Sequence, residues 1–252
     1  MNKGLSYLTV IFLIIFTATG CKENWDRMYT PAIASTWKVE PIETDNAGSF
    51  ISGPVEMTWE APEGTMLGGT EDGITPTTAA NLITQYGSCL LANILKDVII
   101  GEDYDISATY SDEISLDISD IADKNWKDSG TGYATYKEVS GKKKLLVFLD
   151  IDKITNGDEE IKSKINSFPV LKGLITEGIP VLYETTSGQN NIRFLIDLTL
   201  AKQLVPLIVS ITPSIKDDDF QGKGSYIKFL LGNIEEVMNA TKEFTLSVRM
   251  KK

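Results

Sequence analysis

The sequence predicts an α+β fold in which a curved antiparallel sheet packs on two or more long helices. Short stretches of alternating apolar and polar residues, often joined by tight turns, predict antiparallel strands. Longer stretches with apolar residues three and four positions apart predict amphipathic helices. Two stretches that match at an offset of 140 residues suggest an internal duplication, whose two units would bury their apolar faces against each other.

The first 20 residues have the parts of a secretory signal peptide. Lys3 provides a positive start, and Leu8 to Phe16 forms an apolar core. This core is too short for a membrane-spanning helix, which needs about 20 apolar residues. The segment from Ala18 to Cys21 resembles a lipobox, the site at which lipoprotein signal peptidase cuts. We therefore predict cleavage before Cys21 and lipidation of its thiol, with a plain secretory signal as the alternative.

The predicted cleavage defines the domain organisation. Residues 1–20 are a cleaved signal peptide, residues 21–34 a tether after the lipidated cysteine, and residues 35–252 a single α+β domain. The duplication would divide this domain into pseudo-repeats at about 35–130 and 131–252. Each buried methylene of an acyl chain contributes about 0.8 kcal/mol, so several chains on Cys21 anchor the protein firmly. The expected location is the outer membrane, at the cell surface or on the periplasmic face.

The first half of the domain contains two strands, a helix and a third strand. Alternation predicts strands at Thr36–Glu40 and Pro54–Glu60. Thr75 as N-cap and Pro76 at the first helical position predict the start of a helix, which Gly101 would end. One apolar stripe runs along this helix, through Ala79, Leu82, Ile83, Tyr86, Leu90 and Ile94. A strand follows, with Tyr104, Ile106, Ala108 and Tyr110 on one face.

The second half begins with a hairpin and contains three predicted helices. The strands of the hairpin are Tyr133–Tyr136 and Lys144–Ile151. The remaining predicted elements are a helix over 158–168, strands over 178–186 and 192–196, helices around 198–211 and 226–238, and a strand over 244–249. This order of strands and helices matches part of the first half.

The duplication depends on residues that match at the offset of 140. Leu90, Leu91, Asn93 and Ile94 fall on Leu230, Leu231, Asn233 and Ile234. Tyr104, Ile106 and Ser107 fall on Phe244, Leu246 and Ser247. Coincidence among common apolar residues is the alternative explanation.

Several strand segments resemble those of a known family. They are Tyr104–Ser111, Trp126, Gly132–Tyr136, Leu145–Ile154 and Gly178–Val181. Together they are similar to a family of Bacteroidetes outer-membrane lipoproteins that is classed as a domain of unknown function. The resemblance covers most of residues 35–252 and implies an outer-membrane lipoprotein, but its motifs are strand patterns that imply no chemistry.

Composition disfavours several classes of function. The chain contains no histidine, so Ser-His-Asp and Cys-His catalysis and the usual zinc sites are excluded. Its net charge is −11, which opposes binding to nucleic acid. Besides Cys21 only Cys89 remains, in an apolar helical stretch where a free thiol acts as a small hydrophobic group. We therefore expect no enzyme, no cofactor and no nucleic-acid partner.

The acidic segments do not have the spacing of a metal site. Counted from Asp150, glycine stands at position eight and Ile161 at position twelve, whereas an EF-hand needs glycine at six and glutamate at twelve. Asp217, Asp218 and Asp219 are interpreted as a solvated loop. We expect no bound metal ion.

The helices near the C-terminal end contain more apolar residues than a one-sided stripe requires. Such residues either fill the core or line a cavity for a ligand. We predict that the protein binds an apolar small molecule or lipid between its helices and its sheet, through Leu204, Ile208, Phe229, Leu230 and Ile234. The alternative is an adhesion or glycan-binding module that uses Trp37, Trp59 and Trp126 as exposed aromatic side chains.

Overall fold

The computed structural model describes most of the predicted domain. The described residues are 33–69, 71–113, 115–117, 121, 124–139, 141–186, 188–218 and 222–252. Cys21, the predicted signal peptide and most of the predicted tether lie outside them.

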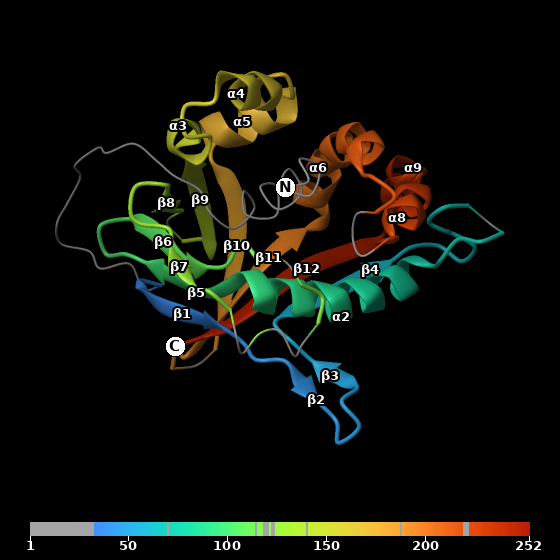
Figure 1. Cartoon of the computed structure of the whole chain (residues 1–252), viewed down its shortest axis with the longest axis horizontal. Helices are drawn as coiled ribbons and strands as arrows, with labels where there is room; N and C mark the ends of the chain where they lie inside the picture. The colour runs from blue at the N-terminus through green and yellow to red at the C-terminus, as the bar shows by residue number, and fades with distance from the viewer. Residues whose placement is uncertain are drawn as a thin grey trace.

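Eight strands of the described residues form a closed antiparallel barrel (Figure 1). Their order around the barrel is β1-β5-β6-β8-β9-β10-β11-β12, and β12 returns to β1. The bounds are β1 Ser35–Val39, β5 Leu95–Ile100, β6 Asp105–Tyr110, β8 Ala134–Glu138, β9 Lys144–Leu149, β10 Ile179–Thr185, β11 Asn191–Asp197 and β12 Glu243–Lys251.

The barrel closes where β12 changes its partner. The first part of β12 pairs with an additional strand, β4 (Val55–Glu60), from Glu243 to Val248. Its last two residues pair with β1 instead, Met250 with Val39 and Lys251 with Lys38. The sheet therefore forks at β12, and β4 extends it away from the barrel.

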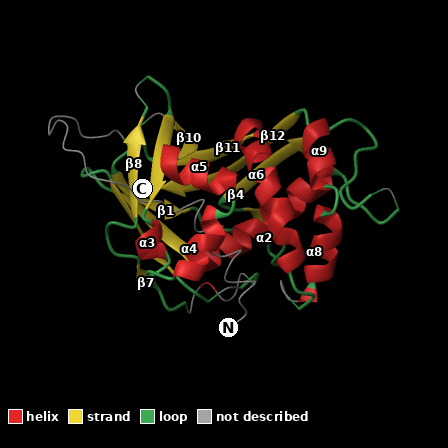
Figure 2. Cartoon of the chain, turned by 90° about the horizontal axis from the view of Figure 1, so that it is seen from above, coloured by secondary structure: helices red, strands yellow, loops and turns green. Residues whose placement is uncertain are grey.

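The two ends of the barrel are built differently. At one end, which we call the hairpin end, short connections join β5 to β6, β8 to β9 and β10 to β11. Every helix of the described residues lies in a long connection at the other end (Figures 1 and 2). The helices are α2 Pro76–Ile94, α3 Ile151–Ile154, α4 Glu159–Asn166, α5 Pro169–Glu177, α6 Leu198–Ile211, η2 Thr212–Ser214, α8 Gly224–Leu231 and α9 Ile234–Ala240. Three short strands also lie in these connections, β2 Glu43–Thr44, β3 Phe50–Ser52 and β7 Lys127–Asp128.

The prediction of an α+β fold with a curved sheet on long helices is therefore wrong, although the strands are antiparallel. The main core lies inside the barrel and not between sheet and helices. Alternate residues of each strand point inward, as closure of a sheet requires. Trp37 of β1 is fully buried there, and its indole Nε1 donates a hydrogen bond of 2.8 Å to the carbonyl oxygen of Ile33.

A second core lies where the sheet extends beyond the barrel. There β4 and β12 are covered by α2, α6 and α9, so that helices pack on the sheet at this place. Trp59 is 5% exposed, contacts Phe244 edge to face with ring centroids 5.6 Å apart, and donates from Nε1 to Oγ1 of Thr241 at 2.8 Å. This core fixes the extension against the helices.

The start of α2 is confirmed and its predicted end is wrong. The hydroxyl oxygen of Thr75 accepts a hydrogen bond of 3.1 Å from the amide of Thr78, which is an N-cap. The helix ends at Ile94, and the next six residues form β5 and not further helix. In the second half of β5 the exposed Ile99 lies between the buried Val98 and Ile100, and these β-branched side chains favour a strand.

The predicted helix over 226–238 is two helices. The chain leaves α8 at Gly232, and Asn233 binds the loop before α2. Its Nδ2 donates to the carbonyl oxygen of Met66 at 2.9 Å, and its Oδ1 accepts from the amide of Gly68 at 2.9 Å. At the offset of 140, residues 235–240 of α9 correspond to β5, so the two halves differ between the matched stretches. The duplication stays a prediction.

We expect Arg249 to stabilise the fork of the sheet. Its Nη2 donates to the carbonyl oxygen of Gly53 at 2.6 Å, and the guanidinium contacts Glu40 at 3.1 Å and Glu56 at 3.2 Å. Since hydrogen bonds to charged groups contribute about 1.5–3 kcal/mol, Arg249→Gln should lower the free energy of unfolding by about 2 kcal/mol in urea denaturation.

The neighbouring Arg193 provides the matched control. It faces the same side of the sheet, but its contacts to Glu56 and Glu184 are 3.7 and 3.8 Å long. Arg193→Gln should therefore cost no more than about 0.5 kcal/mol. Equal losses for the two variants would mean that Arg249 has no special role at the fork.

Candidate functional site

The interior of the barrel contains a cavity of about 60 Å³. The side chains that line it come from six strands and are all apolar. They are Val98, Ile100, Ile106, Leu145, Val147, Val181, Phe194, Leu195, Ile196, Leu246, Val248 and Met250. The cavity therefore favours an apolar group and has no titratable side chain in its wall.

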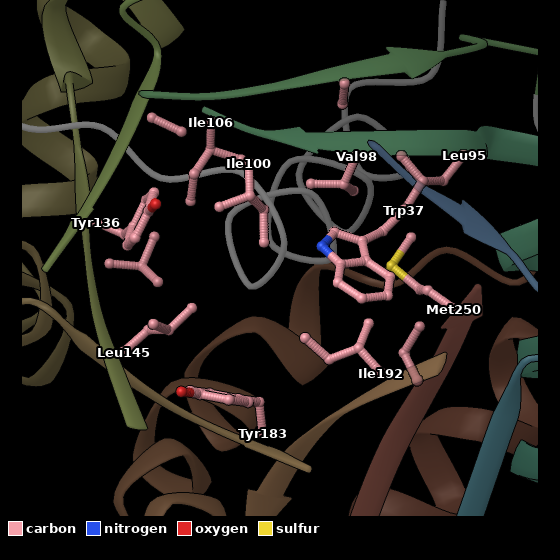
Figure 3. Packing of buried hydrophobic residues seen from close by; sticks show 14 of the residues in the cluster. Trp37, Leu95, Val98, Ile100, Ile106, Tyr136, Leu145, Tyr183, Ile192 and Met250 are labelled. Atoms are coloured by element: carbon pink, nitrogen blue, oxygen red, sulfur yellow. The ribbon is translucent and has the colours of Figure 1, made fainter. Parts of the chain in front are cut away.

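The lining results from the alternation of inward-facing and outward-facing residues along each strand. On β9, Leu145, Val147 and Leu149 are buried, while the residues between them are only partly buried. The register places Leu145 opposite Val181 of β10, so that both reach the cavity from neighbouring strands. Large side chains fill the rest of the interior, among them Trp37 and Met250 in Figure 3.

Polar groups meet inside the barrel near the hairpin end. The hydroxyl of Tyr183 donates a hydrogen bond of 2.5 Å to Oε1 of Glu138. The hydroxyl of Tyr136 donates to the carbonyl oxygen of Gly101 at 2.9 Å, and burial raises the pKa of this phenol above its usual value. Tyr136 therefore stays neutral at physiological pH, and Glu138 contributes a carboxyl group beside the apolar cavity.

The five predicted ligand-binding residues lie elsewhere. Ile234 is buried in the second core, and Ile208 and Leu230 pack against that core. Leu204 is partly buried on α6, whereas Phe229 is 40% exposed on α8. None of the five lines the barrel cavity. The sequence did not reveal the cavity residues, because their alternating apolar pattern is that of any half-buried strand. Only closure of the barrel brings them together around a cavity.

Two of the three tryptophans that the alternative hypothesis used are too deeply buried to stack on a glycan. Trp37 and Trp59 are buried in the two cores, and Trp126 is partly buried. The exposed aromatic side chains of the described residues are instead Tyr86, Tyr226 and Phe229. The last two stack with ring centroids 6.3 Å apart.

The thiol of Cys89 is buried on α2. Burial, and then the nearby Asp117 carboxylate, raise the pKa of this thiol above its usual value. Since the thiolate is the reactive form, the side chain acts as a small apolar group at neutral pH.

Two further properties concern the part of the chain that the structure describes. No group of three or more cysteine, aspartate or glutamate side chains is placed to hold a metal ion there. No helix of that part is long and apolar enough to cross a membrane. The cavity is therefore the candidate site with the clearest geometry. Comparison of the chain with protein-family models, with curated proteins and with solved structures gave no match.

Proposed function

We propose that this chain is a lipid-anchored envelope protein that binds a small apolar group inside its barrel, without catalysing a reaction. The observation that carries the proposal is the cavity, whose lining residues come from six strands and are all apolar. Transfer of an apolar group from water into this cavity is favourable by about 25 cal/mol for each Å² of apolar surface that is buried. The lining offers no nucleophile and no general acid or base, which favours binding over chemistry.

The size of the cavity limits the ligand. Drug-sized ligands occupy pockets of about 300–1,000 Å³, and an engineered cavity of about 150 Å³ holds benzene. Scaled from the cavity that holds benzene, a cavity of about 60 Å³ has room for two or three carbon atoms. The ligand is therefore a short alkyl group, or the end of a longer chain whose remainder stays outside the cavity.

A series of straight-chain alcohols tests this binding. The chain from Lys22 to Lys252 would be titrated with ethanol to octanol, while the methyl NMR signals of the cavity residues are followed. We expect saturable shifts whose affinity rises over the first few carbons and then levels off. Val147→Phe fills the cavity and should abolish the shifts. Val209→Phe, on an exposed site of α6, should leave them unchanged.

A milder variant separates loss of binding from loss of folding. Val147→Ile adds one methylene to the same wall and should weaken binding of the longer alcohols while the barrel stays folded. If the wild-type chain shows no saturable shift with any alcohol, the proposed binding function is wrong. The same conclusion follows if Val147→Phe and Val209→Phe bind equally well.

The anchoring part of the proposal rests on Cys21. We expect Cys21→Ser to abolish incorporation of labelled palmitate and to release the protein from the membrane fraction, because the acyl chains supply the membrane affinity. Cys89→Ala, which removes the other cysteine, should keep both label and membrane retention. Label and retention that survive in Cys21→Ser would contradict the anchor.

A further inference from the structure

We infer that Glu138 binds the polar head of the ligand, and that the ligand is a small primary amine with a short alkyl body. This inference rests on the proposed binding function and names the class of ligand for the same cavity. It is carried by the position of the Glu138 carboxyl group and by the hydrogen bonds that this group makes.

Glu138 stands at the edge of the cavity. In the register of β8 and β9 it lies directly opposite Leu145, which lines the cavity. Tyr183, its hydrogen-bond partner, lies directly opposite Phe194, another residue of the wall. Side chains directly opposite each other in antiparallel strands have Cβ atoms about 5 Å apart. The carboxyl group is therefore in the same layer of side chains as the end of the cavity (Figure 3 shows Leu145 and Tyr183).

One carboxyl oxygen of Glu138 is already bound and the other is not. Oε1 accepts the hydrogen bond from the Tyr183 hydroxyl, which fixes the orientation of the group. Oε2 is buried and has no hydrogen-bond partner among the described residues. Nor does Glu138 form an ion pair with any lysine or arginine of those residues. A buried polar atom without a partner is rare in folded proteins and costs free energy, so its presence beside a cavity points to a ligand.

The chemistry of this oxygen selects the head group. An ionised carboxylate only accepts hydrogen bonds, and bonds between ionised groups are about twice as strong as neutral ones. An alkylammonium group donates to the buried Oε2 and forms an ion pair with the carboxylate, while its alkyl chain occupies the apolar cavity. An alcohol donates without neutralising the charge, and a carboxylate of the same length is repelled. The expected order of affinity is therefore amine, then alcohol, then acid.

Three probes of equal length test the order, namely n-propylamine, n-propanol and propionate, titrated by NMR against the chain from Lys22 to Lys252. We expect propylamine to bind at least about tenfold more tightly than propanol, which corresponds to one charge-assisted hydrogen bond, and propionate not to bind. Glu138→Gln should remove the preference for the amine while propanol still binds. Glu184→Gln removes a charge from an exposed neighbour of Tyr183 and should keep the preference.

The outcomes separate this inference from the proposal on which it rests. If propanol and propylamine bind the wild-type chain with equal affinity, the role of Glu138 is wrong while the cavity remains a binding site. If neither probe binds, both are wrong. Because the comparison of probes needs only the wild-type chain, it remains decisive even if Glu138→Gln does not fold. In that case Tyr183→Phe, which leaves the carboxylate in place, should keep the preference for the amine.

Discussion

Replacing Trp37 with alanine is expected to lower the free energy of unfolding by about 4 kcal/mol, the range found for large aromatic residues in cores. Trp37 is fully buried, and it belongs to β1, the strand that closes the barrel between β5 and β12. Its hydrogen bond to Ile33 also fixes the segment before β1. Urea denaturation followed by circular dichroism measures the loss.

Two controls give this result its meaning. Trp37→Phe keeps most of the buried ring but loses the hydrogen bond, so it should cost clearly less than the alanine variant. Ile99→Ala removes an apolar side chain from the outer face of β5, where Ile99 is 42% exposed, and should cost less than about 1 kcal/mol. A loss at Trp37 no greater than that at Ile99 would show that the barrel does not depend on β1.

Leu145→Ala should have the second-largest effect, with a loss of about 3 kcal/mol and a larger cavity. Leu145 is 1% exposed and lines the cavity, so truncation extends the empty space within the barrel. Because the enlarged cavity accepts larger apolar groups, this variant should bind benzene, which the wild-type cavity is too small to hold. Denaturation and a benzene titration measure the two effects.

Leu146→Ala provides the control for position. Leu146 is the next residue of β9 and is only partly buried, on the opposite face of the strand. Its truncation should cost less, and it should not create benzene binding. Benzene that binds to both variants, or to neither, would contradict the assignment of Leu145 to the cavity wall.

The sequence was a good guide to local structure. The N-cap at Thr75 and the face shared by Val55, Met57 and Trp59 depend on neighbouring residues, and the structure confirms both. The position of β5 was predicted incorrectly, because the apolar stripe and the glycine at 101 predicted a helix that extends to Gly101. Residues 95–100 lie directly after Ile94 with no glycine or proline between, so no signal marks the change from helix to strand.

Closure of the barrel could not be predicted from the sequence. It depends on two residue pairs between β1 and β12, which lie more than 200 residues apart in the chain. The alternating pattern of Trp37 and its neighbours is the same in an open sheet and in a barrel. For this reason the predicted site fell on the helices that pack on the extension, although the cavity lies inside the ring of strands.

The Glu138 site could not be predicted from the sequence either. Thirty-five acidic residues in the chain make any single glutamate unremarkable in the sequence. Two features of the structure distinguish this carboxyl group from the others. Glu138 lies on the inward-facing side of β8, and it contacts Tyr183. The one indication in the sequence is the spacing of Glu138, which lies two and four residues after Tyr136 and Ala134 and therefore on the same side of the strand.

Xenon binding, followed by methyl NMR, tests most directly whether the barrel encloses an accessible apolar cavity. Xenon binds dry apolar cavities without needing a specific polar partner. The structure predicts shifts that saturate with xenon pressure at Val98, Ile106, Val147 and Val248, and no shifts at Leu204 and Ile208. Shifts confined to the helices, or none at the four barrel residues, would contradict a binding site inside the barrel.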